Sequence, residues 1–189
     1  GKLLRFALVG CGRIAKRHAE LLGRQQIGGA QLEAVCDVVR AKADAIAKAF
    51  GVPAYVDMHE MVETEQPDVI VVLTESGRHA EHVIALAPHG RHLVVEKPMA
   101  LTLDDADAMI RACDRHGVRL FVVKQNRFNV PVVKLREALE EASVTVAEDA
   151  LVPIAHWTTP EILPKRFATW FFLAKAEAHD VTVDGGEIT

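Results

Sequence analysis

The sequence predicts an α/β fold in which a parallel sheet is covered by helices on both faces. Three observations lead to this prediction. Short apolar segments alternate with segments of helical periodicity along the first 125 residues, which is the pattern of consecutive βαβ units. The apolar segments are hydrophobic throughout, as strands buried on both faces are. A glycine-rich turn follows the first of them and leads directly into a helix.

The expected strands are short apolar runs, several of which stop at a glycine or a charged residue. They are residues 3–9, 31–36, 54–56, 69–73, 92–95 and 118–123. The expected helices have recognisable caps, such as Asp57 and Thr102 at N-termini and Gly51 and Gly117 at C-termini. They are residues 14–22, 41–50, a short helix after Asp57, and residues 79–87, 102–116 and 131–142. Because ligands of such sheets bind at the carboxyl ends of the strands, the polar residues there are the functional candidates.

The composition is that of an ordinary globular protein. Half of the residues are apolar, a quarter are charged and the formal net charge is −4, which excludes a disordered chain and a strongly basic nucleic-acid-binding protein. No apolar run approaches the ~20 residues of a membrane span, and the N-terminus does not resemble a signal peptide. The three cysteines have no metal-ligand spacing. We therefore expect a cytoplasmic protein with no nucleic-acid or membrane partner and no bound metal.

Residues 10–15, Gly-Cys-Gly-Arg-Ile-Ala, match a dinucleotide-binding turn between a strand and a helix. Gly10 permits a tight turn, Gly12 lets the backbone approach a diphosphate, and the small Ala15 allows close packing of helix on strand. Asp37, at the end of the second strand, can accept hydrogen bonds from both ribose hydroxyls and would repel a 2′-phosphate. The predicted cofactor is therefore NAD. Arg40 leaves NADP open, because a guanidinium can accommodate that phosphate.

Glu96-Lys97-Pro98 follows the strand at residues 92–95. A lysine at this edge can donate to a substrate hydroxyl, and partial burial would tune it for acid/base catalysis. A cis bond before Pro98 would aim that side chain inward. From the residues alone, a solvated lysine is an equal alternative.

Thr74 and His79 flank the end of the strand at residues 69–73 and are candidates for contact with the cofactor ribose. A surface or supporting role is the expectation for the histidines at positions 59, 82, 89, 92 and 116.

Residues 3–142, approximately, resemble the nucleotide-binding domain of the Gfo/Idh/MocA oxidoreductases. The resemblance is carried, in this order, by the glycine turn, Asp37, residues 74–79, the strand at residues 92–95 with Glu96-Lys97-Pro98, and residues 124–127. Residues 119–129 are most similar to the branch that oxidises C3 of a UDP-linked N-acetylaminoglucuronic acid. The resemblance implies a Rossmann-type sheet, NAD as cofactor, and hydride transfer with Lys97 as the catalytic residue. The expected cofactor-binding residues are Gly10, Gly12, Arg13, Ile14, Asp37, Thr74, His79, Glu96, Lys97 and Gln125. The expected substrate-binding residues are Lys97, Asn126 and Arg127.

The sequence is expected to divide into a dinucleotide-binding domain at residues 1–125, a connecting helix at residues 126–142, and a partial second domain at residues 143–189. The last segment carries the whole acidic excess of the chain and is expected to form a short α+β or β tail. Members of the family also use an acid/base histidine from a full second domain, which we do not expect within these residues.

Residues 136–189 resemble part of a Nudix hydrolase. Arg-Glu-x-x-Glu-Glu at residues 136–141 is similar to the second half of that family's box, in which glutamates hold Mg²⁺ against a diphosphate. The first half is not matched, since Phe128 stands where the box requires a glutamate. A solvated acidic helix end is therefore the preferred interpretation of Glu137, Glu140 and Glu141.

These observations give three hypotheses about function. The first is an NAD-dependent oxidoreductase, or its cofactor domain, that acts on a hydroxyl of a nucleotide-linked sugar. The alternative is a catalytically incomplete NAD-binding module or chimera, so the sequence leaves open whether the chain is itself an enzyme. The least favoured is Mg²⁺-dependent diphosphate hydrolysis. The expected partner is a small nucleotide-sugar, and a homo-oligomer is compatible with the sequence.

Overall fold

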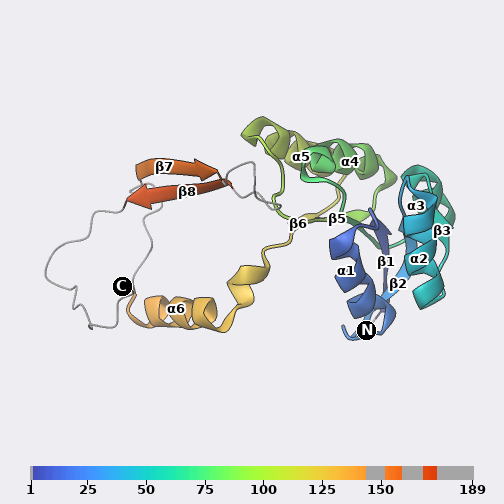
Figure 1. Ribbon diagram of the computed structural model, residues 1–189, viewed down its shortest axis with the longest axis horizontal. Coiled ribbons are helices and arrows are strands. Elements are labelled where there is room, and N and C mark those ends of the chain that lie inside the picture. Colours follow the sequence, from blue (N-terminus) through green and yellow to red (C-terminus); the bar gives the residue numbers. More distant parts are fainter. Residues whose placement is uncertain (1, 144–151, 159–167, 174–189) are drawn as a thin grey trace, which may run out of the picture. The chain divides into compact units, whose positions relative to one another are not determined.

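The computed structural model describes residues 2–143, 152–158 and 168–173. The chain divides into two compact units, Gly1–Arg127 and Phe128–Thr189, each of which is described by itself. The first unit contains a six-stranded parallel sheet with the order β3-β2-β1-β4-β5-β6 (Figure 1). This is the strand order of the Rossmann fold, so the predicted fold class is confirmed.

The strands of the sheet lie within about two residues of the predicted segments at each end. They are β1 (Leu4–Val9), β2 (Ala30–Cys36), β3 (Ala54–Tyr55), β4 (Val69–Val72), β5 (His92–Val95) and β6 (Leu120–Val122). The helices of this unit are α1 (Arg13–Gly23), α2 (Arg40–Phe50), α3 (Met58–Glu65), α4 (His79–Leu86) and α5 (Leu103–Arg115). Short 3₁₀ turns follow β4, α4 and β6 as η1 (Ser76–Arg78), η2 (Ala87–His89) and η3 (Gln125–Phe128).

Helices cover both faces of the sheet because the strands bury side chains on both sides. One apolar core joins the sheet to α3, α4 and α5, and includes Ile70, Leu86 and Met109, all fully buried. The other joins the opposite face to α1 and α2, and includes Leu8 and Ile46. Since side chains alternate along a strand, neighbouring residues of β1 and β4 serve opposite cores.

β1 is the strand at which the chain changes direction across the sheet. Val9 pairs with Cys36 of β2 on one side and with Val72 of β4 on the other. Connections to β2 and β3 run one way from β1, and those to β4, β5 and β6 run the other way. The connecting loops therefore separate above the carboxyl end of β1, which leaves a crevice there.

The caps predicted from the sequence are present. The carboxylate of Asp57 accepts hydrogen bonds from the backbone N–H groups of His59 and Glu60 at the start of α3. Thr102 caps α5 through the N–H of Asp105, and Gly51 ends α2 with a φ of 69°.

The second unit contains α6 (Val130–Glu141) and an antiparallel pair of strands, β7 (Val152–Thr158) and β8 (Ala168–Leu173) (Figure 1). On α6, Glu137 pairs with Lys134 and Glu140 pairs with Arg136. These are neighbouring charges on one exposed helix, in keeping with a solvated acidic helix end. Most of the segment at residues 143–189 lies outside the described residues, so the predicted division at residues 125 and 142 stays a prediction.

Candidate functional site

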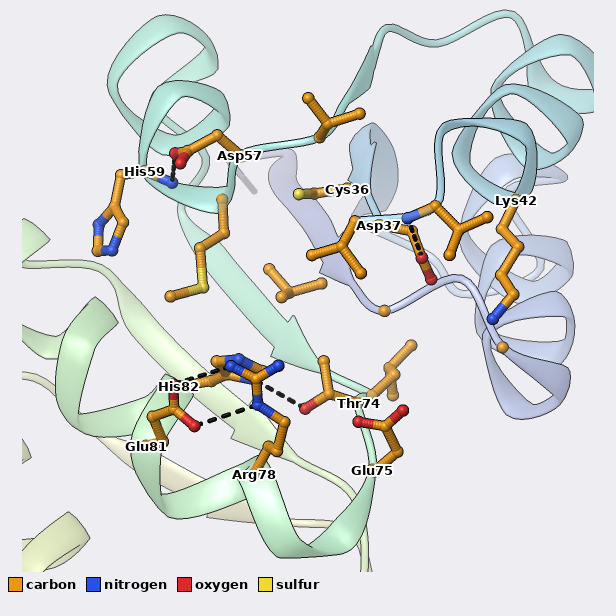
Figure 2. A pocket seen from close by; sticks show the side chains of 18 residues that line it. Cys36, Asp37, Lys42, Asp57, His59, Thr74, Glu75, Arg78, Glu81 and His82 are labelled. Atoms are coloured by element: carbon orange, nitrogen blue, oxygen red, sulfur yellow. Dashed lines mark hydrogen bonds and ion pairs between the residues drawn. The ribbon is translucent and has the colours of Figure 1, made fainter.

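A cleft of about 430 Å³ lies at the carboxyl edge of the sheet, beside the end of β1 (Figure 2). It is lined by the residues that follow β1, β2 and β4 and by the first turns of α2, α3 and α4. This is the crevice in which open α/β sheets bind ligands. Its polar side chains are those of Asp37, Lys42, Asp57, His59, Thr74, Glu75, Arg78, Glu81 and His82.

The glycine turn forms one wall of the cleft. Gly10 has a φ of +97°, and a Cβ placed there would lie 2.8 Å from the backbone carbonyl carbon of Leu73. At Gly12, in contrast, a Cβ would meet no atom within 4 Å. Gly10 is therefore required by the fold, whereas the open space beside Gly12 is where a ligand can approach the backbone.

The helix that follows the turn begins without a side-chain cap. Gly12 is the N-cap residue of α1, and the first turn contains no acidic residue. Its first backbone N–H groups are thus available to an anion, which the helix dipole also favours. The open space and these donors fit the diphosphate of a dinucleotide.

Asp37 connects the two turns that flank the cleft. One oxygen of its carboxylate accepts a hydrogen bond from the N–H of Cys11, and the other accepts one from the N–H of Val39, both at 2.8 Å. The side chain is partly exposed and lines the cleft. Because a carboxylate oxygen has two lone pairs, each can still accept a ribose hydroxyl.

The two basic residues after Asp37 differ in their placement. Arg40, which the sequence left open as a partner for a 2′-phosphate, pairs with Asp44 one turn along α2, at 2.8 Å, and does not line the cleft. Lys42 does line it. Lys42 is not among the site residues predicted from the sequence, although its place on the first turn of the helix after Asp37 is a usable signal.

Thr74 lies at the opposite wall, directly after β4. Its hydroxyl lies 2.9 Å from Nδ1 of His82. His82 is 9% exposed and lines the cleft, so it does not lie on the open surface, and its contact with Thr74 fits the supporting role that the sequence allowed. Burial, with the charge of Arg78 as a further cause, lowers the pKa of His82. A neutral imidazole can accept the hydrogen of the threonine hydroxyl and so orient that hydroxyl.

His79 holds two loops together instead of facing the cleft. Its ring is 1% exposed, with Nδ1 2.8 Å from the carbonyl oxygen of Pro98 and Nε2 3.0 Å from that of Thr74. Both ring nitrogens of His79 are thus engaged by carbonyl oxygens, and neither is free for the predicted contact with a ribose. The residue fixes the backbone on which Thr74 and the Lys97 turn depend.

The Glu96-Lys97-Pro98 turn is held by its own glutamate. The peptide bond between Lys97 and Pro98 is cis. Glu96 is 8% exposed, and its carboxylate accepts a hydrogen bond from the N–H of Lys97 and contacts Nε2 of His18, each at 3.0 Å. Lys97 itself is an exposed residue of this turn.

Four of the predicted site residues meet at the cleft, namely Gly10, Gly12, Asp37 and Thr74. Arg13 and Ile14 are exposed on the first turn of α1. Gln125, Asn126 and Arg127 follow β6 in η3, and Asn126 and Arg127 are not among the residues that line the cleft. Their contacts with cofactor or substrate stay predictions.

The cysteines beside the cleft are poor nucleophiles. Burial, with a further contribution from Asp37, raises the pKa of the Cys11 thiol to about 12. Burial and the charge of Asp57 raise that of Cys36 to about 12 as well. Both thiols therefore stay protonated at neutral pH, and we assign them a packing role.

Within residues 2–143, 152–158 and 168–173, no cluster of three or more histidine, cysteine or acidic side chains has a geometry suited to a metal ion. Nor does any helix among them combine the length and the apolar character that crossing a membrane requires.

Comparison with known proteins assigns the first unit. Residues 4–124 match the family model of the Gfo/Idh/MocA proteins, described as an oxidoreductase family with an NAD-binding Rossmann fold. The WlbA dehydrogenase of Bordetella pertussis, solved in complex with NADH and UDP-GlcNAcA, is 39% identical and superposes with a TM-score of 0.70. That match covers 75% of this chain and 43% of the WlbA chain.

Inositol dehydrogenases are also similar. The myo-inositol 2-dehydrogenase of Thermotoga maritima is 36% identical over 142 residues, which are 75% of this chain and 42% of that protein. The inositol 2-dehydrogenase of Agrobacterium fabrum is 26% identical over 183 residues, 95% of this chain and 53% of that protein. The last alignment takes in most of residues 136–189. The Nudix resemblance expected for that segment is not shown by these matches. The chain spans about half or less of the length of these relatives.

Proposed function

Because the chain belongs to the Gfo/Idh/MocA oxidoreductase family, we propose that it forms the NAD-binding part of an enzyme that oxidises a hydroxyl of a nucleotide-linked sugar. The observation that carries the proposal is the cleft in which the glycine turn, the uncapped start of α1 and Asp37 lie together. When bound, NAD accepts the hydride from the carbon that carries the hydroxyl.

The residues of the cleft have separate tasks in this proposal. The N–H groups after Gly12 bind the diphosphate, and Asp37 binds the adenosine ribose. Thr74, oriented by His82, donates to or accepts from the second ribose. These contacts fix the cofactor along the carboxyl edge of the sheet, where β5 also ends.

Lys97 is the residue that acts on the substrate. It follows β5 directly, in a turn held by Glu96 on one side and by His79 through Pro98 on the other. An ammonium group carried by this turn can donate to the substrate oxygen and take part in transferring its proton. Asn126 and Arg127 are proposed to bind the rest of the substrate.

A nucleotide-linked uronic sugar is the substrate we favour, because WlbA with bound UDP-GlcNAcA is 39% identical. A free polyol is the second candidate, since the myo-inositol 2-dehydrogenase of Thermotoga maritima is 36% identical over a similar span. Both offer a secondary hydroxyl, so the chemistry at Lys97 would be the same.

The test is NADH formation by the full chain with NAD and either UDP-GlcNAcA or myo-inositol. Faster reduction with the nucleotide sugar supports the proposal. Lys97→Ala is expected to lower the rate at saturating NAD by a factor on the order of 10²–10⁴. Lys48→Ala, which removes an exposed lysine from the last turn of α2, is the control and is expected to have no effect.

Two results would change the proposal. Faster reduction with myo-inositol would replace the nucleotide sugar by a polyol. Binding of NADH without turnover of either substrate would overturn hydride transfer by this chain and favour an NAD-binding module.

A further inference from the structure

Two histidines from different elements meet at the edge of the cleft. His59 lies on the first turn of α3, beside the capping residue Asp57 (Figure 2), and His89 is the last residue of the turn η2 after α4. Nδ1 of His59 lies 2.7 Å from Nε2 of His89, and the two ring centroids are 5.0 Å apart. Each ring thus turns one nitrogen toward the other, and ring nitrogens are the atoms through which histidine binds metal ions.

The contact between the rings can be exchanged for a cation. A hydrogen bond between two ring nitrogens uses only one hydrogen, so one of the two facing nitrogens is bare. Burial, and then the neighbouring His59, lower the pKa of His89 below its usual 6.5, which keeps this ring neutral at neutral pH. Moving the hydrogen of a neutral pair to the other nitrogen of its ring frees both facing nitrogens to bind one ion.

The charges around the pair favour a cation over an anion. The carboxylate of Asp57 accepts a hydrogen bond from the backbone N–H of His59. After burial and His59, the charges that act on the pKa of His89 are those of Glu63, which raises it, and Arg91, which lowers it. Two carboxylates against one guanidinium leave an excess of negative charge, and this attracts a divalent cation.

The distance between the two nitrogens is close to the one that a metal ion requires. Zn²⁺ binds imidazole nitrogen at about 2.0–2.1 Å in tetrahedral geometry, which places two such nitrogens about 3.3 Å apart. The present contact of 2.7 Å would have to lengthen by about 0.6 Å, and both histidines are only half-buried. Because the described part of the chain contains no metal-binding cluster of three such side chains, water would complete the coordination of the ion.

We propose that His59 and His89 bind one divalent transition-metal ion of the Zn²⁺ type, which joins α3 to the turn after α4. Imidazole ligands favour Zn²⁺, Ni²⁺ and Cu²⁺, whereas Mg²⁺ and Ca²⁺ prefer oxygen ligands. The ion would lie at the rim of the cleft, since His59 also lines it. Neither histidine has an assigned contact with cofactor or substrate, so the site is independent of the proposed dehydrogenase activity.

The experiment is calorimetric titration of the full chain with zinc chloride at neutral pH, without cofactor. The wild type is expected to bind Zn²⁺ and to melt at a higher temperature when the ion is present. His59→Gln and His89→Gln each keep a hydrogen-bonding side chain but remove a ligand. Each should weaken binding by a factor on the order of 10–100 or more, because losing a residue that only supports a ligand already has such an effect.

Two controls accompany the titration. His116→Gln removes an exposed histidine directly after α5 and should leave Zn²⁺ binding unchanged. Magnesium chloride in place of zinc chloride should produce no binding heat and no rise in melting temperature.

Three results would overturn the proposed metal site. The first is equal Zn²⁺ affinity of the wild type and both glutamine variants at positions 59 and 89. The second is an effect of His116→Gln as large as theirs, since any surface histidine would then serve. The third is binding of Mg²⁺ as strong as that of Zn²⁺, because carboxylates and not imidazoles would then hold the ion. Failure to bind NADH, in contrast, would contradict only the proposed function.

Discussion

Nε2 of His18 on α1 lies 3.0 Å from the carboxylate of Glu96. Glu96 follows β5, which is separated from β1 in the sheet by β4. The same carboxylate accepts the N–H of Lys97. Helix α1 thus supports both ends of the site, since its N-terminus borders the cleft and its second turn fixes the glutamate of the lysine turn.

Replacing His18 should loosen the lysine turn. His18→Leu removes the partner of a buried carboxylate oxygen, and we expect the free energy of unfolding to fall by about 1–3 kcal/mol. Denaturation in urea measures this change. His18→Gln keeps a donor and should lose less. A His18→Leu variant as stable as the wild type would show that the contact contributes nothing.

The two glycines of the turn should respond differently to alanine. Gly10→Ala is expected to destabilise the fold, because its Cβ would overlap the backbone of Leu73 and Thr74 and its φ is +97°. Gly12→Ala should leave the melting temperature unchanged and weaken NADH binding, since its methyl group would occupy the open space beside the turn. Thermal denaturation and NADH titration of both variants separate the two effects. Equal losses of stability would contradict the roles assigned to them.

His79→Leu should lower stability and cofactor affinity together. The substitution leaves the carbonyl oxygens of Thr74 and Pro98 without the buried ring that contacts them. We expect a loss of about 2–4 kcal/mol, measured by urea denaturation, and weaker NADH binding from the displaced Thr74 loop. His79→Gln can still donate to one carbonyl and should recover part of both. Wild-type stability of the leucine variant would be inconsistent with this role.

Asp57 should stabilise α3 in a pH-dependent way. Asp57→Ala is expected to cost about 1 kcal/mol, the usual value of an N-cap, whereas Asp57→Ser should retain most of it. Hydrogen bonds from the backbone of Glu60 and His59 lower the pKa of the Asp57 carboxyl below its usual 3.8. Its contribution is therefore complete above that value and is lost as the pH falls through the lower pKa of the folded state.

The measurement for Asp57 is the difference in unfolding free energy between the wild type and Asp57→Ala at several pH values. This difference should be constant near neutral pH and shrink in acid. A difference that grows as the pH falls would contradict the direction of the pKa shift.

Much of the fold could be predicted from local sequence. Buried strands such as β4 read as uninterrupted apolar runs, and caps such as Asp57 and Gly51 mark helix ends through interactions within a few residues. The glycine turn was predictable for the same reason, because the conformation of Gly10 is a local requirement. β6 is shorter than predicted, since pairing with β5 covers only residues 120–122.

The supporting contacts of the site could not be predicted in this way. His18 and Glu96 are 78 positions apart, and His79 reaches Pro98 across the length of α4 and β5, 19 positions away. Such pairs depend on how helices lie on the sheet, which periodicity does not specify. A partial signal existed at His18, because a histidine on the apolar face of a predicted helix requires a polar partner. The different placement of Arg40 and Lys42 was equally hard to predict, because it depends on which of the two side chains pairs with a carboxylate one turn along α2.

The bonds of Asp37 to the backbone of Cys11 and Val39 have a consequence for how coenzyme preference can change over evolutionary time. Exchanging the aspartate would alter recognition of the ribose and at the same time release two N–H groups that hold the loops after β1 and β2. Adaptation at this position therefore carries a penalty in stability.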